Sequence, residues 1–211
     1  MDEKIIKYRF FYWGPFLYKS KINKNELNKI KKLCSKKSKN VRAELAGLIE
    51  NEHSIDVKKI FPIIFPYIKS YFEAYRENYS NNFTGNTIKL VKSWVNYMKK
   101  GEHNPIHTHS DDLSFIICIQ VPKKLEQEIN EAIGQTEPGL INFIYGLNEN
   151  KNNINRHRFI PTVGDFFIFP SSLHHYVNSF QCEGERITVS GNIKITKVDH
   201  ESNPNRGDIS E

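Results

Sequence analysis

Three apolar residues near the start of the chain recur at helical spacing: Leu27, Ile30 and Leu33. They follow Asn23, a residue type that caps helices, and Glu26 stands three positions later, where a capping box places an acidic side chain that reaches back to the cap. The pattern predicts an amphipathic helix over about residues 24–36.

A second helical stripe predicts a longer helix that runs towards Tyr79. Its members are Val57, Phe61, Ile64, Ile68 and Phe72. Pro62 and Pro66 fall inside this stripe, and we expect them to kink or delay the helix because proline cannot donate a helical hydrogen bond. The aromatic side chains of the stripe are expected in the core.

From Ile88 onward the periodicity changes to that of β-strands. Strands are expected at about 88–98, 113–121, 139–146, 157–162, 165–169, 173–179 and 185–196. Seven or eight short strands close most readily as a two-sheet jelly roll. The predicted fold class is therefore α+β, mainly β, with the N-terminal helices packed on one sheet.

The length of 211 residues suits one well-buried core, so we predict a single domain over 1–211. Residues 1–85 form its helical part, 86–197 its β core and 198–211 a polar tail. The polar segment Asn148–Asn155 is expected to overhang the mouth of the jelly roll.

The composition of the chain and the motifs that it lacks argue against several classes of protein. No apolar run approaches the length of a membrane span, no secretory signal opens the chain, and the three cysteines show no disulfide or zinc-ribbon spacing. We therefore expect a soluble protein of the reducing cytoplasm. Phosphate-binding glycine loops and the G-x-S-x-G motif are absent, which leaves nucleotide hydrolysis and serine hydrolysis without support.

The net charge of +6 is concentrated early in the chain. Nine lysines lie between Lys19 and Lys39, against the single acid Glu26. A solvated helix face is the simplest interpretation, and an anionic partner such as nucleic acid is the alternative if this face lies beside a functional pocket.

The most informative motif is His107-Thr-His109, because residues two apart on a strand point the same way and can share one metal ion. Asp111 restores the spacing His-x-Asp if His109 is the first ligand, and Asp112 is within reach of a loop bend. These carboxylates are the alternative ligands in a site of the non-heme iron kind.

Two further positions complete the candidate site. His174 and His175 are adjacent, so only one can face a pocket, and we choose His175. Arg186 opens the last strand with Thr188 on the same side, and the planar guanidinium of arginine suits a carboxylate.

In combination these motifs resemble the 2-oxoglutarate- and Fe(II)-dependent oxygenase superfamily, in particular a largely uncharacterised branch common in marine phages and bacteria. The resemblance rests on Tyr97-x-x-x-Gly101, His107-x-His109, Leu113-Ser-Phe115, Gly164-Asp165, Phe169-Pro-Ser171, His175 and Arg186-x-Thr188-x-Ser190-x-Asn192. It covers about residues 12–196.

The resemblance implies a double-stranded β-helix with Fe(II) and 2-oxoglutarate as cofactors. His107, His109 and His175 are the implied metal ligands, since both histidines of the His-x-His motif recur in that branch. Arg186 is implied to bind the distal carboxylate of 2-oxoglutarate, with Thr188 and Tyr97 as further contacts.

The implied activity is hydroxylation of a substrate coupled to decarboxylation of 2-oxoglutarate to succinate. Asn96, Asn104 and Asn192 are candidates for cosubstrate contacts or for turn and strand-edge amides. Aromatic and aliphatic residues of the strands suit either the pocket walls or the ordinary core: Phe115, Ile117, Phe143, Tyr145, Phe167 and Phe169.

Two other functions would also use these residues. A zinc hydrolase explains three histidines but has no need of Arg186, and a non-catalytic jelly-roll module would bind without consuming 2-oxoglutarate. The sequence is nearly silent on the primary substrate. A peptide or protein side chain is preferred by analogy with prolyl-hydroxylase-like relatives, ahead of a small metabolite and of nucleic acid.

Overall fold

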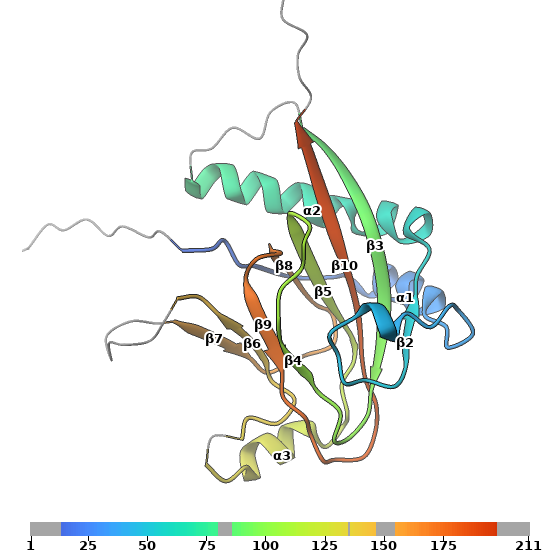
Figure 1. Cartoon of the computed structure of the whole chain (residues 1–211), viewed down its shortest axis with the longest axis vertical. Coiled ribbons are helices and arrows are strands. Elements are labelled where there is room, and N and C mark those ends of the chain that lie inside the picture. The colour runs from blue at the N-terminus through green and yellow to red at the C-terminus, as the bar shows by residue number, and fades with distance from the viewer. Residues whose placement is uncertain (1–13, 80–85, 135, 147–154, 198–211) are drawn as a thin grey trace, which may run out of the picture.

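Two antiparallel β-sheets face each other across a shared core in the computed structural model (Figure 1). It describes residues 14–79, 86–134, 136–146 and 155–197. The predicted tail 198–211 and most of the loop Asn148–Asn155 lie outside these ranges.

The major sheet contains six strands and the minor sheet four. In spatial order the major sheet is β1 (Tyr18–Lys21), β8 (Asp165–Pro170), β5 (Leu113–Gln120), β10 (Arg186–Lys197), β3 (Asn86–Met98) and β2 (Glu52–Ser54). The minor sheet is β4 (Asn104–His107), β9 (His174–Val177), β6 (Ile141–Ile144) and β7 (Arg156–Phe159). This arrangement confirms the predicted two-sheet jelly roll.

Helices α1 (Lys24–Leu33) and α2 (Val57–Tyr79) cover the face of the major sheet that points away from the minor sheet (Figure 1). Their apolar residues form one core with the sheet, and a second core fills the space between the two sheets. The shorter α3 (Leu125–Glu131) follows β5. None of the helices in the described parts of the chain is both long and apolar enough to span a membrane.

The start of α1 confirms the predicted cap, but not the capping box. The Asn23 side chain accepts a hydrogen bond from the Glu26 backbone N–H at 2.9 Å. The Glu26 carboxylate instead accepts from the Tyr67 hydroxyl, and that hydroxyl accepts from the Asn23 N–H at 3.0 Å. Tyr67 of α2 therefore stands between the two residues and ties the helices together.

Helix α2 begins at Val57 and continues through both prolines, so the expected delay of the helix does not occur. Pro62 and Pro66 are exposed and lie one turn apart. The backbone carbonyls that lose a helical partner therefore lie on the solvent side, where water can satisfy them.

Three short strands, one α-helix and a 3-10 helix were absent from the predicted elements: β1, β2, β4, α3 and η1 (Arg42–Glu44). The His-x-His motif was expected on one strand, but β4 ends at His107 and His109 lies beyond it. Strand β1 occupies the beginning of the basic segment, where Lys19 and Lys21 lie 3.4 Å and 2.9 Å from the buried Asp165 carboxylate. Part of the predicted charged helix face is therefore an edge strand whose lysines neutralise a core carboxylate.

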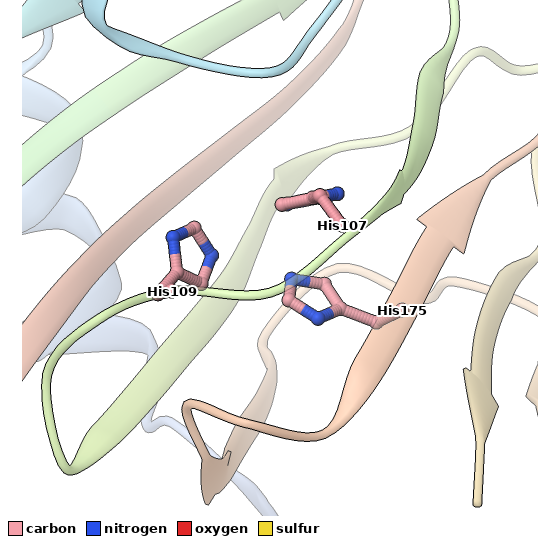
Figure 2. Close-up of side chains that lie close together, drawn as sticks. All are labelled: His107, His109 and His175. Carbon is pink, nitrogen blue, oxygen red and sulfur yellow. The ribbon is translucent and has the colours of Figure 1, made fainter.

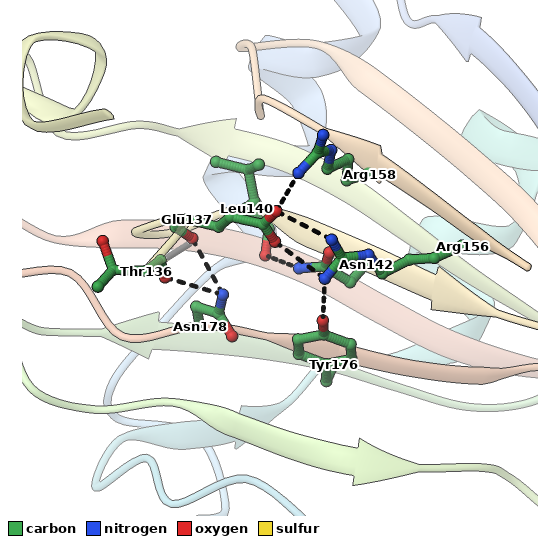
Figure 3. Close-up of polar contacts among 8 residues, drawn as sticks. All are labelled: Thr136, Glu137, Leu140, Asn142, Arg156, Arg158, Tyr176 and Asn178. Carbon is green, nitrogen blue, oxygen red and sulfur yellow. Dashed lines mark hydrogen bonds and ion pairs between the residues drawn. The ribbon is translucent and has the colours of Figure 1, made fainter. Parts of the chain in front are cut away.

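The outer face of the minor sheet is held by a single carboxylate, that of Glu137 (Figure 3). Its side chain is 9% exposed and accepts hydrogen bonds from Arg156 at 3.1 Å and 3.3 Å, and another from Arg158. Asn178 donates to the Glu137 backbone carbonyl at 3.1 Å. These contacts fix the segment before β6 to the edge strand β7.

We expect Glu137→Gln to lower the free energy of unfolding by about 1–3 kcal/mol, because it leaves two guanidinium groups without their carboxylate. Urea denaturation measures the change. The matched control is Glu44→Gln, which removes an exposed ion pair with Lys39 and should leave the denaturation midpoint unchanged. Equal midpoints for all three proteins would contradict a structural role for Glu137.

Candidate active site

A pocket opens between the two sheets. It encloses about 490 Å³ of space free of atoms, part of which is open to solvent. Its lining residues come from both sheets, from the segment before β2 and from the turn after β4: Ile49, Trp94, Asn96, Asn104, His107, His109, Phe115, Ile116, Phe169, His175, Val177, Arg186, Thr188 and Ser190.

Three histidines converge on this pocket (Figure 2). His107 ends β4, His109 follows it in the turn towards β5, and His175 lies on β9 directly opposite His107. One nitrogen from each ring lies within 4.8 Å of those of the other two. The ring centroids of His107 and His175 are 4.2 Å apart, and His109 lies 5.0 Å and 5.2 Å from them.

Backbone carbonyls orient two of the rings. Nδ1 of His107 lies 2.7 Å from the Pro105 carbonyl oxygen, and Nδ1 of His175 lies 2.9 Å from that of Leu173. Because a carbonyl only accepts, each Nδ1 carries the proton and each Nε2 keeps a free lone pair. This is the tautomer that a metal ligand requires.

Burial keeps the imidazoles neutral. Together with neighbouring His107, it lowers the pKa of His175 to about 3 and that of His109 to about 4. Burial also lowers the pKa of His107. All three rings are therefore deprotonated at neutral pH and can donate a lone pair to a cation.

The carboxylates proposed as alternative ligands lie outside this cluster, which among the described residues consists of the three histidines. Asp112 is turned towards β10, where its Oδ2 accepts from the Ile195 N–H at 2.7 Å and lies 3.3 Å from the Lys194 ammonium. Asp111 is not part of the group. His174 is exposed on the outer face, as the alternation on β9 requires.

Arg186 also lines the pocket and is 3% exposed. Its Nη1 donates to the Met98 sulfur at 3.8 Å, whereas Nε and Nη2 have no partner in the described structure. Burial lowers the pKa of the guanidinium. Burying a charge without a counter-ion is costly, so these two donors fit an anion such as the distal carboxylate of 2-oxoglutarate.

Neighbouring polar groups extend this donor set. Thr188 lies on the same face of β10 as Arg186, and its Oγ1 accepts from Asn96 Nδ2 at 3.3 Å. Asn104 also lines the pocket, and its Oδ1 is buried without a partner. Asn192 lies further along β10 and accepts from the Ser114 hydroxyl at 3.2 Å, so it serves the strand packing.

Tyr97 does not reach the pocket, which corrects its expected place among the cosubstrate contacts. On β3 the residues that line the pocket are Trp94 and Asn96, and alternation turns Tyr97 to the opposite face. There it packs in the core beneath the helices, with the Lys36 ammonium 4.7 Å above its ring. Asn96, the residue before Tyr97, faces the pocket instead.

Most of the aromatic and aliphatic residues expected in the pocket walls are also distributed between the two faces of the major sheet. Phe143, Phe167 and Phe169 lie in the core between the sheets, where Phe169 also lines the pocket. Phe115 and Ile117 belong to the core beneath the helices, although Phe115 also borders the pocket, and Tyr145 is 56% exposed. Ile49 and Trp94 were not expected in the pocket. The spacing of Trp94 from Asn96 is the signal that would have found Trp94.

Comparison with known proteins identifies the β core. Residues 92–192 match the family described as "Putative 2OG-Fe(II) oxygenase". The β core is therefore similar to that of 2OG-Fe(II) oxygenases. This confirms the predicted superfamily, whose cofactors are Fe(II) and 2-oxoglutarate. A comparison with curated protein sequences finds no match.

Solved structures of this superfamily share the fold of the 2OG-Fe(II) oxygenase core. A prolyl-4-hydroxylase from Pseudomonas putida aligns with a TM-score of 0.54 and 12% identity over 84% of this chain and 91% of that one. A 2OG-Fe(II) oxygenase family oxidoreductase from Burkholderia pseudomallei aligns with a TM-score of 0.53 and 12% identity over 86% of this chain and 84% of that one. The third structure is a prolyl hydroxylase from Trichoplax adhaerens in complex with a peptide fragment of hypoxia inducible factor. It aligns with a TM-score of 0.51 and 12% identity over 85% of this chain and 82% of that one.

The low pKa of the pocket histidines predicts that the metal-free protein is sensitive to acid. Below pH 6.5 the unfolded chain binds protons at these residues, while folded His109 stays neutral down to about pH 4. Stability should therefore fall as the pH is lowered from 6.5 to 4, by about 1–3 kcal/mol per histidine. Urea midpoints in the presence of a chelator measure this. The stability of His109→Asn should fall less than that of the wild type between pH 6.5 and pH 4. The control His157→Asn, which changes an exposed histidine, should lose as much stability as the wild type. An equal loss of stability in all three proteins would contradict the prediction.

Proposed function

We propose that this protein is an Fe(II)- and 2-oxoglutarate-dependent dioxygenase that hydroxylates a primary substrate while 2-oxoglutarate is converted to succinate. The observation that carries the proposal is the presence, in one pocket, of three convergent neutral imidazoles and a buried guanidinium with two unpartnered donors. A metal ligand set and an anion clamp are the two parts that this chemistry requires.

In this proposal His107, His109 and His175 hold the metal through their Nε2 atoms. Bound Fe(II), together with 2-oxoglutarate and O2, supplies the oxidising power that inserts oxygen into a C–H bond. The ring orientations of His107 and His175 are set in advance by the Pro105 and Leu173 carbonyls, so little conformational entropy is lost when the cation binds.

Arg186 binds the distal carboxylate of 2-oxoglutarate, and the Thr188 hydroxyl beside it supplies a further hydrogen bond. The apolar side chains Ile49, Ile116 and Val177 line the same pocket and limit the access of water. A dry environment strengthens the ionic contact and protects the reacting centre from side reactions.

A three-histidine zinc hydrolase accounts for the imidazoles but gives Arg186 no role. A non-catalytic binding module would retain metal and anion without turnover. Anaerobic protein with Fe(II) and 2-oxoglutarate should develop a visible metal-to-ligand charge-transfer band, and aerobic protein should release succinate. If the protein neither develops the band nor releases succinate, the other two functions are favoured.

His107→Ala, His109→Ala and His175→Ala should each abolish stoichiometric Fe(II) binding, because each removes one of three ligands. Asp111→Ala and His174→Ala are the matched controls and should retain iron, since neither side chain belongs to the cluster. Metal analysis after anaerobic gel filtration measures the content. Loss of iron from both His109→Ala and Asp111→Ala, together with retention by His107→Ala, would establish His109-x-Asp111 as the ligand motif.

Arg186→Gln should weaken 2-oxoglutarate binding by about one to two decades and spare iron. The reason is the loss of charge-assisted hydrogen bonds, which contribute about 1.5–3 kcal/mol. Titration of the charge-transfer band gives the affinity, and exposed Arg42→Gln serves as the control. An unchanged affinity in Arg186→Gln would refute the role of the guanidinium.

A further inference from the structure

The pocket-facing side of the major sheet can be followed in rows across β3, β10 and β5. Antiparallel register places the following residues side by side: Met98 with Arg186; Asn96, Thr188 and Cys118; Trp94, Ser190 and Ile116; Lys92, Asn192 and Ser114; Lys89 with Lys194. The rows therefore begin at a buried cation and end at lysines.

The last row faces the same side of the sheet as the pocket. Leu90 and Ile193, which precede it on the two strands, belong to the core beneath the helices. Alternation then turns Lys89 and Lys194 to the opposite face, and both are exposed. Lys92 is two positions from Trp94, with its ammonium 5.5 Å from the centre of the indole ring.

The histidines lie between the two charged ends. His109 is 5.9 Å from the Trp94 ring, in the middle row, and Lys92 contributes to lowering the pKa of His109. At about 3.3 Å per residue, Arg186 and Lys194 each lie about 13 Å along β10 from Ser190 in that row. A molecule held by Arg186 thus approaches the histidines from one side, and the lysines border the other.

This end of the sheet carries more positive charge than its neighbours neutralise. Lys194 pairs with Asp112 at 3.3 Å, but it stands directly opposite Lys89, an arrangement of like charges that destabilises a sheet. Lys92 contributes to lowering the pKa of Glu44, but the Glu44 carboxylate is already paired with Lys39 at 2.8 Å. No carboxylate lines the described pocket.

We propose that the primary substrate carries an oxyanion, a carboxylate or a phosphate, that binds the cluster of Lys89, Lys92 and Lys194 while the carbon to be oxidised lies at the histidines. This inference rests on the proposed function and names its substrate class. The binding of an anion offsets the repulsion between the facing lysines, and the charges also steer an anionic substrate to the mouth. The basic residues of α1 do not contribute, since that helix packs on the other face of the sheet.

Trp94 provides the readout in a Trp13→Phe background, where it is the single tryptophan. Anaerobic protein loaded with Fe(II) and 2-oxoglutarate, which occupies Arg186, is titrated with phenyl phosphate, benzoate and neutral benzyl alcohol. Both anions should change the Trp94 fluorescence and bind at least about tenfold more tightly than the alcohol, with an affinity that falls as salt is added. The better of the two anions distinguishes a phosphate from a carboxylate group.

Lys92→Gln and Lys194→Gln should each weaken anion binding about threefold to tenfold, as expected for partly exposed charges. Lys32→Gln, which removes an exposed lysine from α1, should leave it unchanged. Equal binding of anion and alcohol, or unchanged affinity in both pocket-side variants, would overturn the proposal.

The same titration separates this proposal from the proposed function. If the protein fails to bind 2-oxoglutarate, the metal-free Arg186→Gln variant still reports anion binding at the lysines through Trp94. Binding that persists there and is lost in the Lys92→Gln double variant supports the lysine cluster, whereas binding insensitive to Lys92 refutes it.

Discussion

Strand β10 is hydrogen-bonded to β3 on one side and to β5 on the other, and this pairing determines what the pocket can contain. Because side chains alternate along a strand, a single register decides that Arg186, Thr188 and Ser190 face the minor sheet while Ile187, Val189 and Ile193 pack beneath the helices. A shift of one residue would bury the wrong set and remove the guanidinium from the pocket. The burial of the apolar side chains of β10 therefore fixes the register that directs its polar side chains into the pocket.

The minor sheet supplies the opposite wall on the same principle. β4 and β9 pair so that His107 and His175 lie directly across from each other, and the pairing register shifts between Asn104 and His107. The turn that follows β4 is anchored by the hydrogen bond of the His109 N–H to the Ser171 carbonyl at 2.9 Å. The three imidazoles that we propose as metal ligands thus come from backbone segments that are themselves hydrogen-bonded, which holds the rings close together in the absence of a cation.

The sequence was informative where periodicity and burial coincide. The long apolar strands and the stripe of α2 were predicted close to their observed bounds, because one buried face per element leaves a clear pattern. Strands β1, β2 and β4 were missed since each has three or four residues, several of them polar, and gains its structure from a neighbouring strand. Tyr97 was misplaced for a related reason: both faces of β3 are buried, so hydrophobicity does not reveal which face meets the pocket. The convergence of the three histidines followed from their motif, whereas the lysines beside them became visible only through the strand register.

The carbonyl partners of the histidine rings have an electrostatic consequence. A carboxylate partner would share negative charge with the ring, and a carboxylate ligand would cancel one charge of a divalent ion. Here Pro105 and Leu173 supply neutral acceptors, and the three donor rings are neutral as well. A divalent ion bound by these rings would keep its full double charge, so the pocket as a whole, which Arg186 also lines, would select for ligands that bring negative charge with them.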